Sequence, residues 1–300
     1  MMETLTHCPL CASSDIDLFL NTQDYSVSHG TFKIDRCKNC NFIFTNPRPN
    51  ESEIGKYYDS ESYQSHHNES KSLLNKLYSW ARTIAVKGKI DLVKQYDLNP
   101  EKFVIDIGCG TGFFLQECVK HDWRVAGTEP DKDARNIASK HSNVAIVPTI
   151  FDDTLTDRKF TTITMWHVLE HVHRLHETIE WIHQHLKDNG VLIVAVPNVN
   201  SYDAHKYKST WAALDVPRHL YHFTRETIHN LMNKHQFQIE SIKPMWFDSY
   251  YVSMLSTKYK TGRIKWFDTF IAGTISNLKG YASHHNNLNT SSLIYILKKK

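Results

Sequence analysis

Hydrophobic positions along the chain follow two repeats, which predict strands alternating with helices. Short β-branched or aliphatic runs are typical of buried strands. Between these runs, apolar residues recur at steps of three and four, as in amphipathic helices. One such stripe starts at Val168, continues to Leu186 and ends at Gly190, which we interpret as a helix C-cap. This alternation predicts an α/β fold. Its seven expected strands cover 103–106, 123–130, 143–147, 160–166, 191–198, 237–246 and 291–300.

Two cysteine pairs precede this pattern. Cys8 and Cys11, and then Cys37 and Cys40, are each separated by two residues. Two such turns can direct four thiolates at one ion, and a tetrahedral sulfur shell suits structural zinc. The 25-residue spacer predicts a hairpin, with strands at 17–20 and 31–37. We therefore expect a small zinc ribbon over residues 1–50, with two disulfides or unrelated free thiols as the alternatives.

The rest of the chain divides into a lead-in and a main domain. A proline-rich turn at 46–49 marks the end of the ribbon. Apolar positions from Leu73 to Val93 then predict one or two helices within a lead-in over 51–98. The main domain covers 99–300, with long insertions at 200–223 and 247–290 that we expect to cover the active site.

Composition limits the classes of function. The chain has 300 residues, of which 41% are hydrophobic and 22% charged, with a formal net charge of +3. This near-neutral charge argues against a dedicated nucleic-acid binder. The first residues lack the apolar stretch that is typical of a signal peptide, and the most apolar run, at 191–196, is too short to span a membrane. We expect a cytoplasmic protein with reduced cysteines, which favours zinc over disulfides.

The strongest motif is a strand, a glycine turn and a helix at 103–119. Gly108, Gly110 and Gly112 let a ligand approach the main chain, and Asp106 precedes them. The third glycine comes one residue too early for the dinucleotide pattern, and a carboxylate would repel a pyrophosphate. It would favour S-adenosylmethionine (SAM), which carries an ammonium, a sulfonium and no phosphate. Glu129 ends the next strand, where an acid can accept hydrogen bonds from a ribose diol.

The octapeptide WHVLEHVH at 166–173 permits two interpretations. His167, Glu170 and His171 have the H-x-x-E-H order of the inverted zinc peptidases. His167, however, stands at the exit of a strand, so the two histidines need not share a helical face. Strand ends face the ligand crevice in open α/β sheets. We interpret the octapeptide as the floor of the cofactor site, and we expect the histidines at 173, 176, 183 and 185 to lie on the solvated surface.

These motifs together resemble a known family. DIGCGTG, GTEP, FTTITMWHVLEHV and LKDNGVLIVAVPN, in this order over about residues 99–245, resemble class I SAM-dependent methyltransferases. The resemblance is greatest to the bacterial group that includes ubiquinone O-methyltransferases. It implies a Rossmann-like, seven-stranded methyltransferase sheet behind the zinc ribbon. The ribbon resembles a bacterial subset that includes nucleotide-sugar C-methyltransferases, but the chain is too short for their usual further C-terminal domain.

Methyl transfer to a hydroxyl group benefits from a base, and histidine suits this near neutral pH. His171 is the first candidate and His219, in an aromatic-rich loop at 201–224, is the second. In the same loop we expect Trp211 and His222 to contact the acceptor. The alternatives are that His171 only braces its loop and that Trp211 only packs. The predicted SAM-binding residues are Asp106, Gly108, Cys109, Gly110, Gly112, Glu129, Phe151, Trp166 and His167.

The functional prediction is a SAM-dependent methyltransferase acting on a small molecule or on a glycan- or lipid-linked acceptor, at oxygen. One alternative is an RNA methyltransferase that grips its substrate with the ribbon. Another is a non-catalytic binding module that retains the SAM fold. Residues 249–255 are a candidate homodimer surface, and Tyr63 and His66 are candidates to fold over the cofactor.

Overall fold

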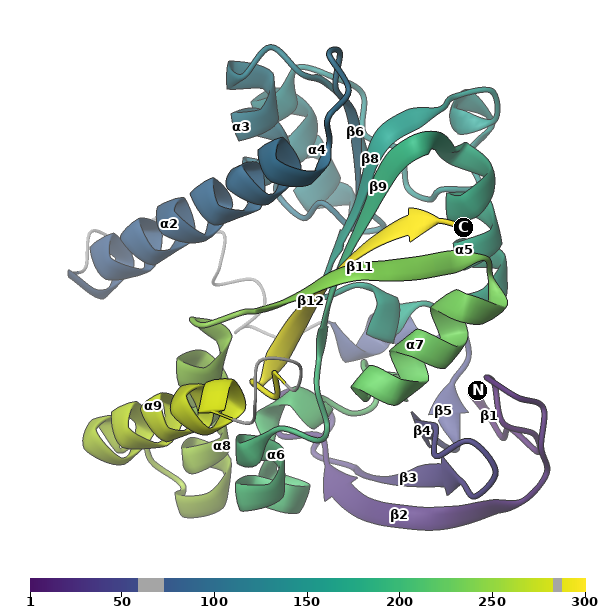
Figure 1. The fold of residues 1–300 in the computed structure, drawn as a ribbon. Coiled ribbons are helices and arrows are strands. Elements are labelled where there is room, and N and C mark those ends of the chain that lie inside the picture. The colour runs from purple at the N-terminus through teal and green to yellow at the C-terminus, as the bar shows by residue number, and fades with distance from the viewer. Residues whose placement is uncertain (59–72, 283–287) are drawn as a thin grey trace.

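The protein is described here by a computed structural model, drawn as a ribbon in Figure 1. The structure describes residues 1–58, 73–282 and 288–300, with side chains described for 1–58, 82–280 and 288–300. Tyr63 and His66 lie outside the described residues.

A six-stranded mixed sheet forms the centre of the molecule, in the order β11-β12-β9-β8-β6-β7. The strands from β9 to β7 run parallel to one another, whereas β12 runs antiparallel to both of its neighbours. The strands are β6 (Phe103–Ile107), β7 (Arg124–Thr128), β8 (Phe160–Trp166), β9 (Leu186–Pro197), β11 (Phe237–Pro244) and β12 (Ser292–Lys299).

The sheet has one strand fewer than the seven predicted. The expected third strand, at 143–147, forms only an isolated parallel bridge between Val147 and Thr128. Asn143 has a left-handed backbone (φ 54°) at the end of the preceding helix, and Pro148 has no N–H to donate to a neighbouring strand. The segment between these two residues is too short to continue the pairing.

Helices cover both faces of the sheet (Figure 1). Ile90, Phe114 and Ala138, from three helices, are buried with residues of one face. Ile179 and Leu231, from two others, belong to the buried cluster on the opposite face. The first three helices are α2 (Leu73–Tyr96), α3 (Phe113–Lys120) and α4 (Lys132–Ser142), and the other two are α5 (Leu175–His185) and α7 (Arg225–Lys234).

The helix predicted from 168 to 190 is shorter than expected, and its C-cap was wrong. The chain first makes a 3-10 turn, η4 (Leu169–His171), and α5 ends at His185. Gly190 lies inside β9, because pairing with β8 begins as early as Phe160 opposite Leu186. Sheet pairing therefore takes the residues that the apolar stripe assigned to the helix.

The N-terminal region forms a four-stranded sheet in the order β10-β4-β3-β2. The predicted hairpin is confirmed, with β2 (Ile16–Gln23) antiparallel to β3 (Thr31–Cys37). The last strand added to this sheet is not local, because β10 (Tyr221–His222) follows the central strand β9 and pairs with β4 (Ile43–Thr45).

This N-terminal region shares a hydrophobic core with the main domain. Phe42 and Phe44 are fully buried in the same cluster as Ile105 and Leu220. Two histidines make polar contacts with it. His173, just before α5, has its Nε2 2.9 Å from the carbonyl oxygen of Pro49, and His176 within α5 has its Nε2 2.8 Å from that of Pro9. His185 is buried beside Trp181. The expectation that these three histidines are solvated was therefore wrong.

The two predicted insertions pack together at one end of the sheet (Figure 1). The first contains α6 (Tyr202–Tyr207), η5 (Lys208–Thr210), η6 (Ala212–Leu214) and β10, and the second contains α8 (Asp248–Thr261) and α9 (Trp266–Ala282). Within the described part of the chain, no helix is both long and apolar enough to cross a bilayer. The remaining elements are β1 (Met2–Glu3), β5 (Arg48–Pro49), η1 (Ile54–Tyr57) and η3 (Asp153–Leu155).

Candidate active site

The glycine turn between β6 and α3 has the backbone that its composition predicts. Gly108, Gly110 and Gly112 have φ values of 69°, 54° and 79°, in the left-handed region that favours glycine. A Cβ at Gly108 would lie 2.5 Å from Val168, and one at Gly112 would lie 2.8 Å from the backbone of Ala138. A Cβ at Gly110 would meet no atom within 4 Å among the described residues. Only Gly110 therefore borders open space, whereas the other two glycines permit close packing.

The two acids flank this turn. Asp106 is 3% exposed and accepts a hydrogen bond from Thr164 Oγ1 at 2.6 Å. Burial raises its pKa to about 6, even though Lys89 and Thr164 act in the opposite direction. Glu129 accepts backbone N–H bonds from Gly110 at 2.8 Å and from Asp131 at 2.9 Å. Each carboxylate oxygen of Glu129 keeps a second lone pair for another donor.

Trp166 ends β8 close to the turn. Its ring packs edge-on against Phe114, with the ring centroids 5.9 Å apart. The buried indole Nε1 has no hydrogen-bond partner in the part of the chain that the structure describes. Lys89 of α2 places its ammonium 4.5 Å from the centroid of the Trp166 ring and interacts with the Asp106 carboxylate. The α2 helix thus contributes a cation to the predicted cofactor site.

Two further predicted SAM-binding residues are Cys109, in the turn, and Phe151, after Pro148. Cys109 is half-buried, and burial raises the pKa of its thiol. Phe151 is 43% exposed, with the guanidinium of Arg174 5.6 Å from the centroid of its ring. Phe151 therefore offers an accessible aromatic face, and its contact with adenine stays a prediction.

His167 has a strained, left-handed backbone (φ 57°) where β8 ends. Its Nδ1 lies 3.4 Å from Glu170 Oε1, and its Nε2 lies 3.9 Å from Asp248 Oδ2 and 3.3 Å from Met245 Sδ. Burial alone would lower the pKa of His167, but the carboxylates of Asp248 and Glu170 together raise it. His167 therefore faces a local excess of negative charge.

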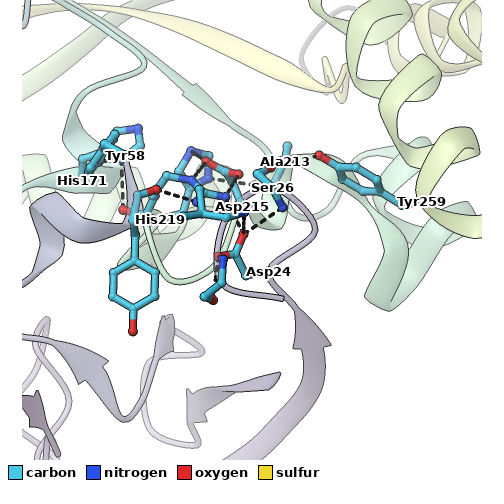
Figure 2. A network of polar contacts seen from close by, with 12 residues as sticks. Asp24, Ser26, Tyr58, His171, Ala213, Asp215, His219 and Tyr259 are labelled. Carbon is cyan, nitrogen blue, oxygen red and sulfur yellow. Dashed lines mark hydrogen bonds and ion pairs between the residues drawn. The ribbon is translucent and has the colours of Figure 1, made fainter. Parts of the chain in front are cut away.

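The two candidate bases, His171 and His219, meet in the structure. Their rings are perpendicular, with centroids 4.6 Å apart. His171 Nδ1 lies 3.0 Å from the carbonyl oxygen of Arg218 and 2.9 Å from Tyr58 Oη. His219 Nδ1 lies 2.9 Å from the carbonyl oxygen of Ala213 (Figure 2). A carbonyl oxygen only accepts, so in each neutral ring Nδ1 carries the proton and Nε2 does not. Burial, with His171 close by, lowers the pKa of His219 well below its ordinary value.

A buried ion network supports the His219 loop. Arg218 makes a two-pronged contact with Asp215, at 2.9 and 2.7 Å, and a third bond to Asp24 at 3.0 Å. Its remaining Nη1 donates to the carbonyl oxygen of Tyr57 at 2.8 Å. Figure 2 shows Asp24 beside Asp215 of the His219 loop, although Asp24 comes from a distant part of the sequence. The network ties the loop that carries His219 to the N-terminal region.

The two residues predicted to contact the acceptor are buried. Trp211 is 3% exposed and donates from Nε1 to Asp203 at 2.8 Å. His222 is 4% exposed, and its Nε2 lies 3.1 Å from Thr45 Oγ1 on β4. Burial lowers the pKa of His222 to about 3. These partners favour the alternative, packing role for Trp211 and a similar one for His222; the acceptor contacts stay a prediction.

The four predicted zinc ligands gather at one point. Cys8, Cys11, Cys37 and Cys40 each offer a sulfur, and all four sulfurs lie within 4.8 Å of one another. Sγ of Cys8 lies 3.6 Å from that of Cys40, and the same distance separates Cys11 from Cys37. Four sulfurs about 2.3 Å from one zinc ion would be about 3.8 Å apart, whereas a disulfide requires about 2.05 Å. The geometry suits a metal better than disulfides.

Glu170, His171 and His219 form a second group whose atoms could hold a metal ion. Each contributes one ligand atom within 4.8 Å of the others, and Glu170 is completely buried. The WHVLEHVH motif suggested His167 with His171 as the metal-binding pair. The structure instead combines Glu170 and His171 with His219, which lies 48 residues further along the chain.

Several residues of this site were not predicted from the sequence. Lys89 gave a signal that could have been used, because it is a cation next to Ile90 on the buried stripe of a predicted helix. Glu170 was visible in the octapeptide but received no role. Tyr58, Asp215 and Arg218 gave no local signal, because their importance depends on contacts between distant segments.

The sequence around the glycine turn matches a known protein family. The family described as "Methyltransferase domain" matches residues 81–242, which is more than half of the chain. The chain belongs to this methyltransferase family. The match begins in α2 and ends in β11, so it includes the glycine turn, both acids and the His171–His219 pair. The protein is a SAM-dependent methyltransferase.

Two relatives illustrate the similarity. The ubiquinone biosynthesis O-methyltransferase of Glaesserella parasuis serovar 5 (strain SH0165) is 33% identical over 108 residues, which cover 32% of this chain and 46% of that protein. The match thus spans less than half of the relative. The crystal structure of magnesium protoporphyrin IX methyltransferase from Synechocystis PCC 6803, with bound SAH, has a TM-score of 0.53 at 12% identity, covering 84% of this chain and all of that one. This second likeness concerns the fold alone.

Proposed function

We propose that this methyltransferase transfers the methyl group of SAM to an oxygen atom of a small molecule or of a glycan- or lipid-linked acceptor. The observation that carries the proposal is the His171–His219 pair with its two unprotonated Nε2 atoms. His171 follows the carboxyl end of β8, His219 lies in the long loop after β9, and Val168, next to His171 in the chain, packs on the glycine turn. The O-methyltransferase name of the curated relative agrees with this reaction.

The residues around the glycine turn fit SAM. Gly110 borders open space, Glu129 can accept from a ribose diol, and the buried indole N–H of Trp166 awaits an acceptor. The Lys89 ammonium suits the carboxylate of the methionine moiety, and Asp106 suits a nearby cation. When bound, SAM supplies an electrophilic methyl group on a sulfonium. The protein's own part is to orient the acceptor, exclude water and receive the acceptor's proton.

We assign the receipt of that proton to His171. Its Nδ1–H is held by the carbonyl oxygen of Arg218, so Nε2 is the atom that can take a proton from an acceptor hydroxyl. The low pKa of His219 keeps this neighbour neutral. Once His171 is protonated, the buried carboxylate of Glu170 stabilises the resulting imidazolium. The positive charge that proton transfer creates on His171 therefore lies next to a negative charge.

The test compares His171→Gln and His219→Gln with His229→Gln, a control on the exposed side of α7. His171→Gln should lower kcat by about 10²–10⁴-fold, the usual contribution of a positioned base, while SAM affinity changes little. His229→Gln should leave both quantities unchanged. Transfer of label from SAM is measured on small-molecule, glycan, lipid and RNA pools, and SAM affinity by calorimetry.

Other outcomes identify other functions. Label in RNA alone would favour the RNA methyltransferase, and SAM binding without transfer to any pool would favour a binding module. A metal ion that is present in the wild type and lost in His219→Gln, measured by elemental analysis, would assign Glu170, His171 and His219 to metal binding and overturn the base assignment.

We also propose that Cys8, Cys11, Cys37 and Cys40 hold one structural zinc ion. All four positions are filled by sulfur, so the shell is closed and leaves no open position for a substrate. The ribbon would then act by supporting the loop that carries His219, through the β4–β10 pairing.

A further inference from the structure

Helix α9 has its large apolar side chains outside and its small or polar side chains inside. Phe267, Phe270 and Leu278 are 77%, 64% and 64% exposed. A helix on the surface of a globular protein normally shows the opposite arrangement. Contiguous exposed apolar surface of this kind marks an interaction site. The buried positions are Thr269, Ala272, Gly273, Ser276, Asn277 and Gly280.

The inner face of α9 is committed to its neighbours, so the helix cannot rotate to hide its aromatic residues. Ser276 donates to Asp203 at 2.8 Å, and Asn277 accepts from Ser249 Oγ at 2.7 Å and donates to the carbonyl oxygen of Trp246 at 3.0 Å. A Cβ at Gly273 would lie 2.6 Å from the ring of Tyr250 on α8. Rotation would break buried hydrogen bonds and create a clash.

The exposed residues form one surface, which we call the α9 face. It contains Ile264, Trp266, Phe267, Phe270, Ile271 and Leu278, all of them exposed. Cations surround it in the sequence. Five of them and one carboxylate lie between residues 258 and 280, a net charge of +4, whereas the whole chain carries +3. The five cations are Lys258, Lys260, Arg263, Lys265 and Lys279.

We propose that the α9 face docks on an anionic lipid bilayer. Exposed aromatic and aliphatic side chains would enter the boundary between head groups and acyl chains, and the cations would contact lipid phosphates. Tryptophan, present here as Trp266, is enriched at this level of membranes. A symmetric dimer would bring the same surface of two copies together, and so would oppose two charges of +4. The charge therefore favours the bilayer over a second copy of the chain.

The α9 face is connected to the candidate active site through α8. Asp248, the first residue of α8, lies 3.9 Å from His167 Nε2. Further along α8, Ser256 accepts from the backbone N–H of Ala212 at 2.8 Å, in the loop that continues to His219. Among the proposed acceptors, docking at this face favours the lipid-linked class. That refinement rests on the proposed function, whereas bilayer binding itself does not.

The experiment is flotation of the full chain with vesicles, without SAM or acceptor. Vesicles of phosphatidylcholine alone are compared with vesicles containing about one third phosphatidylglycerol, which have a negative surface potential. We expect binding to the anionic vesicles only, weakened by salt. Phe267→Ser with Phe270→Ser, and separately Arg263→Glu with Lys265→Glu, should each reduce binding at least about tenfold. The matched control is Leu18→Ser with Leu98→Ser, at residues that are 52% and 81% exposed elsewhere on the molecule.

Several results would overturn the proposal. These are no binding of the wild type to anionic vesicles, equal binding to neutral ones, or binding to RNA but not to vesicles. A wild-type dimer that Phe267→Ser with Phe270→Ser converts to a monomer, with no vesicle binding, would assign the face to a second copy. Unchanged thermal unfolding and SAM affinity show that each variant is folded. Because flotation needs no methyl transfer, loss of the proposed O-methylation would leave this test intact.

Discussion

At the scale of single residues, Glu170 connects the parts of the site. Its side chain is completely buried, and the contact of His167 Nδ1 with its Oε1 is long, at 3.4 Å. His167, His171 and His219 surround it. A buried carboxylate with such weak donor contacts is unfavourable. Its environment improves when a neighbouring histidine gains a proton, so Glu170 favours proton transfer toward the site.

Asp106 gives a test at the same scale. Burial raises its pKa from 3.8 to about 6, so the folded state binds a proton more readily than the unfolded state. Stability therefore falls as pH rises through this window, and the cost is fully present at pH 7.5. Asp106→Asn keeps an acceptor for Thr164 and should raise the free energy of unfolding at pH 7.5 by roughly 1–3 kcal/mol, with no gain near pH 4. SAM binding should weaken by about 1–3 kcal/mol.

Urea denaturation and calorimetry measure the two effects, with Asp133→Asn, on the exposed first turn of α4, as the control. Unchanged SAM affinity in both Asp106→Asn and Glu129→Ala would contradict the cofactor assignment.

At the scale of elements, the loop from 213 to 222 joins the two halves of the molecule. It carries His219, ends in β10 on the N-terminal sheet and is tied to Asp24 by Arg218. Sequence patterns predicted the hairpin of β2 and β3 and most of the central strands, because their apolar periodicity is local. They did not predict β10, which has only two residues and a pairing partner far away in the sequence. They also overextended the helix before β9, because an apolar stripe does not reveal where sheet pairing begins.

Arg218→Met tests this connection. It leaves the fully buried Asp24 without its cation and should reduce the free energy of unfolding by about 3–5 kcal/mol. Arg218→Lys keeps the charge but not the planar guanidinium, so its free energy of unfolding should lie between those of the wild type and Arg218→Met. Arg36→Met, at a more exposed ion pair with Asp17, should cost less than about 1 kcal/mol.

The effect of Arg218→Met should also depend on pH. Burial raises the pKa of Asp24, but the backbone N–H of Ser28 and the charge of Arg218 outweigh it, so the pKa is lowered. Burial also raises the pKa of Asp215, but the hydrogen bond and charge of Arg218 outweigh this effect, so that pKa is lowered as well. A carboxyl group with a lowered pKa stabilises the folded state above pH 3.8, the ordinary pKa of aspartate. This stabilisation is lost as the pH falls through the pKa of the folded state. The difference between wild type and Arg218→Met in urea should therefore shrink below about pH 4. An equal difference at pH 7.5 and pH 3.5 would contradict the ion network.

At the scale of the whole molecule, the predicted ribbon and the methyltransferase domain share one core. Cys8, Phe42 and Phe44 belong to the same buried cluster as Ile105 and Leu220. Cys37 ends β3 of the four-stranded sheet, whereas Asp106 and Trp166 lie on β6 and β8 of the six-stranded sheet and Glu129 follows β7. The β4–β10 pairing therefore places the N-terminal region to influence the His219 loop more directly than the predicted SAM-binding turn.

Zinc removal should separate the effect of the N-terminal region on methyl transfer from its effect on SAM binding. Cys37→Ser, or a chelator, should release zinc and lower methyl transfer at least about tenfold, because β4 would no longer hold β10 and the His219 loop. SAM affinity should stay within about threefold, because its proposed residues lie elsewhere. Metal release, SAM calorimetry and labelled transfer are measured on the same samples. Loss of SAM binding together with zinc would instead show that the ribbon and the cofactor site fold as one unit.

Local sequence was sufficient for the features that neighbouring residues control. The glycine turn, the two acids, the cysteine pairs and the amphipathic repeats act through backbone conformation and spacing over a few residues. Contacts across the fold required the packed molecule. Tyr58, His171 and His219 meet, Arg218 reaches Asp24, and α9 turns its aromatic residues outward, because distant segments compete for the same buried space. Such competition depends on how the whole chain packs, and no short window of residues contains it.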